Sequence, residues 1–446
     1  MKLSDLRLIM PSYKRYQMSS QPLGLYYIKA YLEKHGYSVT VTDLNVQPLH
    51  FGNEKVVGVY VSTFLFNEAK QIIDEAKALG KIVVAGGVHV WSDPDSLREI
   101  GVDYLVQGDG EISMLKIMQQ LDETNYSQPK PNTPVFINPV EDLDSLPIPK
   151  RVKYPTSPVL STSRGCLFNC SFCSTGHIGK LIRYHSPERV VEEMGRLRGQ
   201  DIAILDDLFT ADLKRLVTIQ KMMQKERLDI SITIGNGTRI DLADRERLKT
   251  LKRMNLQKIC YGVESIDNDV LRACNKKTTF EKIDATIKRT KRMSIPLTVF
   301  MIIGLPRDTL QKTIKAAKWV EKEGLTAFWN VATPYPRTAF YDWVNRHGRW
   351  LIDPKDYNNY GGHFGKALKV VFDTENFPLH QRLAVAERLS VDSYPLYKRA
   401  ATLLLGKVGK SKREMLAWAE QSIPTPVCRA LFGSGQGEYL KKEARK

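Results

Sequence analysis

The sequence predicts an α/β protein built from two successive series of alternating strands and helices. Its strand segments are continuous apolar runs such as VVGVYVST and KIVVAGG, which are typical of parallel strands buried on both faces. The segments between them have the apolar periodicity of amphipathic helices. We therefore expect a Rossmann-like doubly wound parallel sheet, then a six-unit (β/α) partial TIM barrel, then a mainly helical C-terminal region.

The first series occupies residues 1–125. Its first expected helix, PLGLYYIKAYLEKHG, ends at Gly36, a residue type that commonly closes helices. The other expected elements are the strands RLIMP, YSVTVTDLN, VVGVYVST, KIVVAGG and DYLVQGD, and the helices NEAKQIIDEAKALG, SLREIG and EISMLKIMQQLDE. Because open parallel sheets bind ligands at the carboxyl ends of their strands, the loops that follow these strands are candidate ligand contacts.

The second series occupies residues 158–345 and follows a proline-rich linker, residues 126–157. Its expected strands are PVLSTSRG, DIAILDD, ISITIG, KICYGVE, LTVFMIIGLP and TAFWNVATP. In such barrels the chemistry lies at the C-terminal ends of the strands. Residues 346–446 begin as an aromatic-rich loop and continue as helices, which we expect to form a substrate or accessory region. The basic tail KKEARK is expected to be disordered.

The composition is that of an ordinary globular protein of 446 residues with a net charge of +17. The positive charge is concentrated after residue 150, and a basic body can attract RNA, acidic membrane surfaces or anionic substrates, or can simply be solvated. No stretch approaches the ~20 uninterrupted apolar residues of a membrane span, and the N-terminus lacks the apolar core of a signal peptide. We therefore expect a cytoplasmic protein.

Three of the six cysteines crowd into one segment, STSRGCLFNCSFCSTG, after the first strand of the second series. The spacing Cys166-x3-Cys170-x2-Cys173 allows three thiolates to converge on one iron–sulfur cube, with one iron left open for a substrate or cofactor. A zinc site completed by His177, or catalysis by a lone thiolate, are the alternatives. Outside this segment the cysteines show no paired spacing, and Cys260 is expected to be a buried structural thiol.

This segment resembles the signature of the radical S-adenosylmethionine enzymes, Cys-x3-Cys-x-aromatic-Cys. Phe172 fills the aromatic position, which the resemblance implies to be a contact of S-adenosylmethionine. The resemblance implies a 4Fe-4S cluster on the three cysteines, with S-adenosylmethionine on the open iron. It also implies that one electron, supplied by an external donor of the flavodoxin or ferredoxin type, cleaves S-adenosylmethionine to methionine and a 5′-deoxyadenosyl radical. The protein orients and shields these cofactors.

The resemblance also implies contacts to S-adenosylmethionine from later strand ends. Asp206 and Asp207 end the second strand, where a carboxylate can accept the methionyl ammonium, although Asp207 also suits a helix cap. Arg239 follows the third strand and offers a fork for the methionyl carboxylate, or else a surface salt bridge.

Two further segments match the family. Glu264, in YGVES, would reach the ribose or the methionyl group, and Gly304, in FMIIGLP, would let the backbone approach the adenine. TPYPRT resembles the family's TPYPGT, but Arg337 replaces the glycine. This departure leaves the local turn and its contacts open.

The first series resembles the cobalamin-binding domain that precedes the barrel in one subgroup of these enzymes, so the whole resemblance covers roughly residues 5–345. It implies a corrin between the C-terminal edge of the sheet and the barrel mouth. The implied contacts lie in three strand-end loops: Ser62, Thr63, Gly86, Gly87, Val88, His89, Gly108, Asp109 and Glu111. The Asp-x-His-x-x-Gly ligand motif is absent from the loop PSYKRYQMSSQPLG, so His89 is expected near the corrin rather than on cobalt. A degenerate sheet without cobalamin is the alternative.

The resemblance favours a cobalamin-dependent methyltransferase acting on an unactivated carbon of a small-molecule or lipid-like metabolite. One S-adenosylmethionine would methylate the cobalamin and another would supply the radical. Alternatives are radical modification of RNA, for which the chain's end offers no evident β-barrel module, and cyclisation or rearrangement without methyl transfer. A non-catalytic iron–sulfur carrier or sensor is another, although a carrier would favour four cysteine ligands. GKVGKS is not a phosphate loop, because Leu404 occupies the position of its first glycine.

Overall fold

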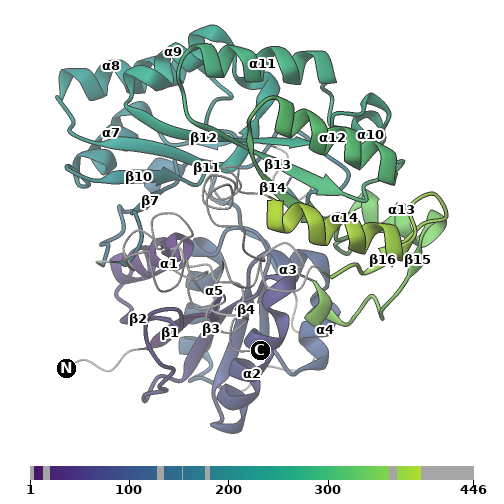
Figure 1. Ribbon diagram of the computed structural model, residues 1–446. Coiled ribbons are helices and arrows are strands. Elements are labelled where there is room, and N and C mark those ends of the chain that lie inside the picture. The colour runs from purple at the N-terminus through teal and green to yellow at the C-terminus, as the bar shows by residue number, and fades with distance from the viewer. Residues whose placement is uncertain are drawn as a thin grey trace, which may run out of the picture.

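The computed structural model describes residues 5–13, 21–127, 135–152, 154–175, 181–360 and 369–392. His177, Cys428, the GKVGKS segment and the basic tail lie outside the described residues. Figure 1 shows one α/β domain, formed by the elements up to β6, beneath a second one, with the elements from α13 onward beside both.

The first domain contains a six-stranded parallel sheet in the order β2-β1-β3-β4-β5-β6. Apolar side chains of α1 and α5 pack on one face of the sheet and those of α2 pack on the other, which confirms the doubly wound arrangement. In chain order the elements are β1 (Leu6–Met10), α1 (Leu23–Lys34), β2 (Val39–Asp43), β3 (Val56–Tyr60), η2 (Thr63–Leu65), α2 (Phe66–Ala78), β4 (Ile82–Gly86), α3 (Val88–Ser92), α4 (Pro94–Glu99), β5 (Tyr104–Val106), α5 (Glu111–Glu123) and β6 (Val135–Phe136).

The strand β6 lies in the segment that the sequence predicts to be a linker. Its two residues pair with Leu105 and Val106 of β5. Because a two-residue strand carries no usable periodicity, the sequence pattern does not reveal it. The segment therefore extends the first sheet by one strand before the chain crosses to the second domain.

The second domain contains six parallel strands whose spatial order, β14-β13-β12-β11-β10-β7, follows the chain in reverse. Among the described strands β7 and β14 do not pair, so the barrel is open, as predicted. The helices α8, α9, α11 and α12 form a layer along its outer face (Figure 1). The elements are β7 (Val159–Leu160), β8 (Ser163–Arg164), β9 (Arg183–Tyr184), α7 (Pro187–Gly195), β10 (Asp201–Ile204), α8 (Leu213–Lys225), β11 (Ser231–Arg239), η4 (Ile240–Leu242), α9 (Arg245–Arg253), β12 (Leu256–Glu264), α10 (Asn268–Ala273), α11 (Phe280–Arg292), β13 (Leu297–Ile303), α12 (Leu310–Lys322) and β14 (Thr326–Val331).

The expected first strand of the barrel, PVLSTSRG, is divided into β7 and β8. β7 joins the parallel sheet, whereas β8 pairs antiparallel with β9, so that Arg164 lies opposite Arg183. The cysteine segment begins directly after β8 and the chain returns through β9. This small hairpin therefore fixes both ends of the cysteine loop at the mouth of the barrel.

The described C-terminal elements are α13 (Ala339–His347), β15 (Arg349–Trp350), η5 (Tyr357–Asn359), β16 (Phe372–Asp373) and α14 (Leu379–Asp392). β15 and β16 form an antiparallel pair, and apolar residues of α14 join the core of the second domain. η5 contacts the first domain through the Tyr357 hydroxyl, which donates to Asp93 Oδ2 at 2.5 Å. No helix among the described residues is both long and apolar enough to cross a membrane.

Candidate active site

The cysteine loop presents three free thiols at the C-terminal end of the barrel strands. Cys170 is buried, and Cys166 and Cys173 are partly buried. Burial raises the pKa of Cys166 to about 11 and also raises the pKa of Cys170, so thiolates at these positions require a cationic partner. Among the described residues, no three His, Cys, Asp or Glu side chains gather closely enough to hold a single metal ion. Three thiols on one loop suit the larger iron–sulfur cube better than one zinc ion.

Two cations lie next to Cys170. Arg239 Nη1 is 3.7 Å from Cys170 Sγ, and its guanidinium stacks on the Phe168 ring at 3.6 Å. Arg239 is 5 % exposed and also donates to Asp241 Oδ1 at 3.0 Å, so it is a buried group of the site and not a surface ion pair. Lys276, which the sequence analysis missed, accepts a hydrogen bond from Arg239 at its carbonyl. Both cations oppose the increase in the pKa of Cys170 and would offset the negative charge of a thiolate-bound cluster.

Glu264 and Lys276 form a buried ion pair at the end of β12. Lys276 Nζ donates to Glu264 Oε1 at 2.9 Å, and both side chains are almost fully shielded from solvent. Although burial opposes ionisation, Glu264 and Cys170 together raise the pKa of Lys276. Gly262 makes room for the pair, since a Cβ there would lie 2.5 Å from Glu264 Oε1. Glu264 has φ 67°, a left-handed conformation that tertiary contacts must maintain.

Asp206 and Asp207 have different surroundings. Asp206 is buried and accepts from Thr162 N at 2.5 Å and from the Thr162 and Ser163 hydroxyls at 2.6 Å. It therefore fixes the turn between β7 and β8. Asp207 is exposed at the barrel mouth, and its charge contributes to the raised pKa of Cys166. Desolvation by the surrounding protein and the charge of Asp206 raise the pKa of Asp207 to about 6, so it is ionised at neutral pH and available to an ammonium.

Gly304, at the end of β13, is covered by the C-terminal region. It has φ 89°, and a Cβ there would lie 2.5 Å from Arg382 Nη1. Arg382 is 1 % exposed and donates to Phe377 O at 2.7 Å, and burial lowers its pKa to about 10. Asp308 accepts from Gly304 N at 2.8 Å. α14 therefore holds the backbone of this segment, and Phe172 joins the neighbouring apolar cluster.

A second candidate site is a cavity of about 430 Å³ between the first sheet and the barrel. Its walls come from one face of the sheet, from α1 and α5, and from the barrel residues Ser161, Arg164 and Leu205. Of the predicted cobalamin contacts, five line it: Gly86, Gly87, Gly108, Asp109 and Glu111. The lining is largely apolar and includes Leu8, Gly58 and Val84 from the sheet, so a flat ring system fits its chemistry.

Gly87 shows why the rim of this cavity needs glycine. It has φ 106°, and a Cβ there would lie 2.6 Å from the carbonyl oxygen of Val61 and 3.0 Å from the Tyr60 ring. Ser62, beside this contact, is 2 % exposed, and its hydroxyl has no hydrogen-bond partner among the described residues. The Ser62 hydroxyl is shielded, and Ser62 does not line the cavity.

Four predicted cobalamin contacts lie away from the cavity lining: Ser62, Thr63, Val88 and His89. His89 is fully buried, with Nδ1 3.1 Å from Thr63 Oγ1 and Nε2 3.0 Å from Ser96 Oγ. Burial lowers the pKa of His89 to about 4, so the ring is neutral. His89 thus ties η2 to α4 and packs against Tyr357 at 4.7 Å.

Asp109 and Glu111 form ion pairs with two arginines of the β8–β9 hairpin. Arg164 donates to Asp109 Oδ1 at 2.9 Å and to Glu111 Oε1 at 2.7 Å, and Arg183 donates to Asp109 Oδ2. Burial opposes ionisation of Asp109, but the two arginines outweigh it and hold its pKa below the usual range. The Arg164 guanidinium also lies 5.3 Å from the centre of the Tyr27 ring. We refer to this set of residues as the arginine clamp.

Arg337, which replaces the family's glycine, keeps a glycine-like backbone. Its φ is 61°, and Nη1 donates to Trp91 O of the first domain at 3.0 Å. The turn is therefore preserved, and the longer side chain adds a contact between the domains.

Known protein families match both the domain that carries the cysteine loop and the domain whose sheet lines the cavity. Residues 160–320 match the radical SAM superfamily model, and residues 15–117 match the model of the B12 binding domain. An uncharacterized methyltransferase of Pyrococcus horikoshii is 29% identical over 363 residues, 72% of this chain and 78% of that protein. An anaerobic magnesium-protoporphyrin IX monomethyl ester cyclase of Rubrivivax gelatinosus is 26% identical over 71% of this chain and 64% of its own. The structure of the methyltransferase TsrM from Kitasatospora setae, with cobalamin and a [4Fe-4S] cluster bound, aligns over 99% of both chains with a TM-score of 0.71 and 16% identity.

Proposed function

Because this chain belongs to the radical S-adenosylmethionine enzymes that carry an N-terminal cobalamin-binding domain, we propose that it transfers a methyl group to an unactivated carbon of a small molecule. The observation that carries the proposal is the cavity between the two domains, whose wall contains both Gly87 of the sheet and Arg164 of the cysteine hairpin. A corrin bound there would contact Arg164, which directly precedes the cysteine loop. Two cofactors that share one mouth suit a reaction that uses both.

In this proposal Cys166, Cys170 and Cys173 hold the cluster, and the cavity holds the cobalamin. When bound, the cluster supplies the electron that cleaves S-adenosylmethionine, and the cobalamin carries the methyl group. The chain's own task is to bind and orient these groups and to keep water away from them.

Different residues around the cysteine loop are assigned to different groups of S-adenosylmethionine. Asp207 is assigned to the methionyl ammonium, because its carboxylate is the exposed one of the pair. Arg239 and Lys276 provide positive charge for the methionyl carboxylate, and Glu264 fixes the Lys276 ammonium in place. Gly304 is assigned to the adenine side by its place at the end of β13. Its N–H and carbonyl are already bonded to Asp308 and Arg382, so it contributes shape and not hydrogen bonds.

The substrate is proposed to be a small molecule. An external one-electron donor completes the reaction. We propose the cytoplasm as the compartment, because free thiols that serve as cluster ligands persist where the environment is reducing.

Ring closure without methyl transfer is the second candidate, because the relative from Rubrivivax gelatinosus is named a cyclase. Both candidates need the same cofactors, but only methyl transfer consumes S-adenosylmethionine as a methyl donor. The products of S-adenosylmethionine therefore distinguish them.

The test is anaerobic reconstitution with iron, sulfide and cobalamin, followed by reduction in the presence of S-adenosylmethionine. We expect a bound corrin in the optical spectrum, and both 5′-deoxyadenosine and S-adenosylhomocysteine among the products. Release of 5′-deoxyadenosine with no S-adenosylhomocysteine from the corrin-loaded protein would contradict methyl transfer and favour the cyclase-like candidate. A Cys170→Ala variant serves as the control for cluster-dependent cleavage.

A further inference from the structure

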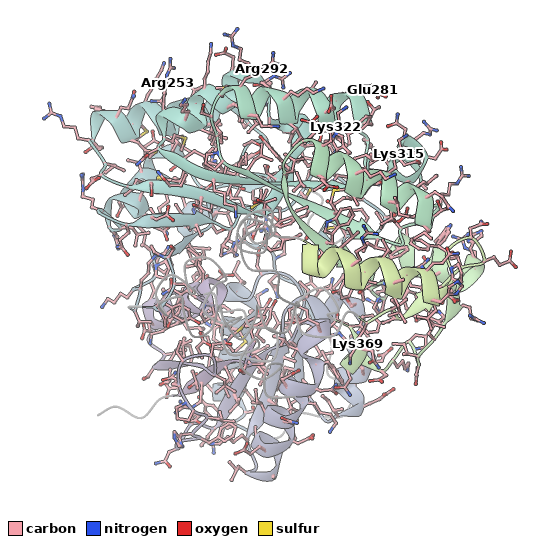
Figure 2. The ribbon with its side chains drawn as sticks, viewed as in Figure 1. Arg253, Glu281, Arg292, Lys315, Lys322 and Lys369 are labelled. Carbon is pink, nitrogen blue, oxygen red and sulfur yellow. The ribbon has the colours of Figure 1, made fainter. Side chains whose placement is uncertain are left out.

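A basic hollow lies on the outer surface of the second domain, around the turn between α10 and α11. Its volume is about 290 Å³, and its lining residues are Arg272, Asn275, Lys277, Thr278, Thr279 and Lys282. Arg272 is mostly exposed and pairs with Asp269, while Lys277 and Lys282 are exposed and contact no carboxylate in the described part of the chain. The acidic side chain of Glu281 lies at the start of α11 and limits the positive charge on that side (Figure 2).

The floor of the basic hollow has room for an anionic group. Thr278 is 7 % exposed, and its hydroxyl has no hydrogen-bond partner among the described residues. The hollow also lies at the N-terminus of the 13-residue helix α11, whose N-cap residue, Thr279, makes no side-chain capping hydrogen bond. The first N–H of α11 is already bonded, since Phe280 N donates to Asn268 Oδ1 at 2.8 Å, and Glu281 lies in the first turn. The buried free hydroxyl of Thr278 and the exposed ammonium groups of Lys277 and Lys282 are therefore the groups that suit a carboxylate.

The basic hollow is connected directly to the cysteine loop. Asn275 Nδ2 donates to Asn169 Oδ1 at 2.7 Å and to Asn169 O at 3.1 Å. The neighbouring residues are bonded as well: Ser171 N donates to Cys274 O at 2.9 Å. Asn169 is exposed and precedes Cys170 in the chain. A protein that covers the basic hollow therefore covers the outer side of the loop that holds the proposed cluster.

We propose that the basic hollow is the docking surface for an acidic one-electron donor protein. The inference rests on the proposed function, which needs an electron from outside the chain. One electron leaves the reduced donor and enters the cluster on the three cysteines, so the donor is oxidised by one unit as the cluster is reduced by one. Electron-transfer partners bind through small, transient interfaces, and opposite charges on the two surfaces raise the rate at which they meet.

The test compares two triple charge reversals in the reconstituted full chain. R272E/K277E/K282E reverses the basic hollow. K225E/R253E/R292E is the control: it changes the net charge by the same amount at the C-terminal ends of α8, α9 and α11, where all three residues are exposed. Arg292 and Lys282 lie near opposite ends of α11, and Figure 2 shows Arg253 and Glu281 at opposite ends of the helical layer.

Reduction of the cluster is followed by freeze-quench electron paramagnetic resonance, with a reduced flavodoxin of negative net charge as the donor and no methyl acceptor present. At low ionic strength we expect the hollow variant to be reduced at least about tenfold more slowly than the parent protein, and the control variant to stay within about twofold. The difference should shrink as salt is added, because screening weakens the attraction.

Dithionite, which needs no docking surface, reports whether the variant holds an intact cluster and should reduce all three proteins alike. Equal rates with flavodoxin for the hollow variant and the parent would overturn the proposal, as would an equal loss in both variants. Because the signal is the reduced cluster itself, the result stands apart from whether the protein transfers a methyl group.

Discussion

At the scale of single residues, the site depends on buried charges that compensate one another. Lys276 and Glu264 are both shielded from solvent, so removing one partner leaves the other charged and unpaired. Glu264→Gln should therefore lower the free energy of unfolding by about 3 kcal/mol, and Lys276→Met by a similar amount. The double variant should lose markedly less than the sum. Urea unfolding of the four proteins measures the coupling, and additive losses would contradict a buried pair.

His89 gives the protein a defined pH dependence. Its neutral ring is favoured in the folded state, where burial lowers the pKa from its ordinary value of 6.5 to about 4, although Asp93 nearby opposes this shift. The stabilisation is complete above pH 6.5 and is lost as the pH falls from 6.5 towards 4, because the unfolded chain then binds the extra proton. Over that interval His89 should account for about 3 kcal/mol of the loss in unfolding free energy. His89→Gln should remove this portion of the slope; equal slopes in both proteins would refute the assignment.

How much of the site follows from the sequence is clearest residue by residue. The cysteine spacing identifies the cluster loop because three ligands on one short loop need no knowledge of the fold. Lys276 could not be predicted, because it reaches the site from the turn after α10, which no sequence motif marks. Asp206 and Asp207 are adjacent in the sequence, and only the hydrogen bonds from Thr162 and Ser163 reveal which carboxylate is already occupied.

At the scale of elements, the loop between β4 and α3 is shaped by close backbone contact. Gly87→Ala would bring a Cβ within 2.6 Å of a backbone oxygen at a positive φ, so the loop would have to move. Gly108 is the matched control, since its φ is also positive, 85°, but a Cβ there meets nothing within 4 Å. We expect Gly108→Ala to cost about 1 kcal/mol and Gly87→Ala clearly more. Chemical denaturation is the readout, because Gly108 also lines the cavity and cobalamin binding would not separate the two positions. Equal losses of unfolding free energy in the two variants would remove the steric argument.

Whether an element could be predicted from the sequence depends on its length. Long strands and amphipathic helices follow from apolar periodicity, which is why the two sheets and most of their helices could be predicted. The two-residue strands β6, β8 and β9 could not, because their pairing is set by distant chain segments and not by local pattern. Of these, the β8–β9 hairpin matters most, since it carries both arginines of the clamp.

At the scale of the whole molecule, the arginine clamp couples the two domains. Arg164 and Glu111 are both poorly exposed and bond in a forked geometry. A double-mutant cycle with Arg164→Gln and Glu111→Gln should give a coupling energy of about 1–3 kcal/mol. The exposed pair Lys70–Asp74 on α2 is the control and should give about 0.3–0.5 kcal/mol. Unfolding of each variant supplies the values, and a coupling at the clamp as small as that of the control would show that the domains are joined by other contacts.

Other hydrogen bonds also join the first domain to later parts of the chain. Tyr27 donates to Glu193 at 3.1 Å, and Tyr154 donates to Asp43 at 2.6 Å, both joining the first domain to later parts of the chain. Arg337 and Tyr357 do the same from the C-terminal side. None of these pairs could be read from the sequence, because each joins residues more than 100 positions apart.

The β8–β9 hairpin ties both ends of the cysteine loop to one side chain of the first domain. Arg164 and Arg183, one from each strand of the hairpin, both donate to the carboxylate of Asp109. A movement of the loop that carries Asp109 would therefore displace both ends of the cysteine loop at once. Changes at the strand ends of the first sheet are in this way transmitted to the mouth of the barrel.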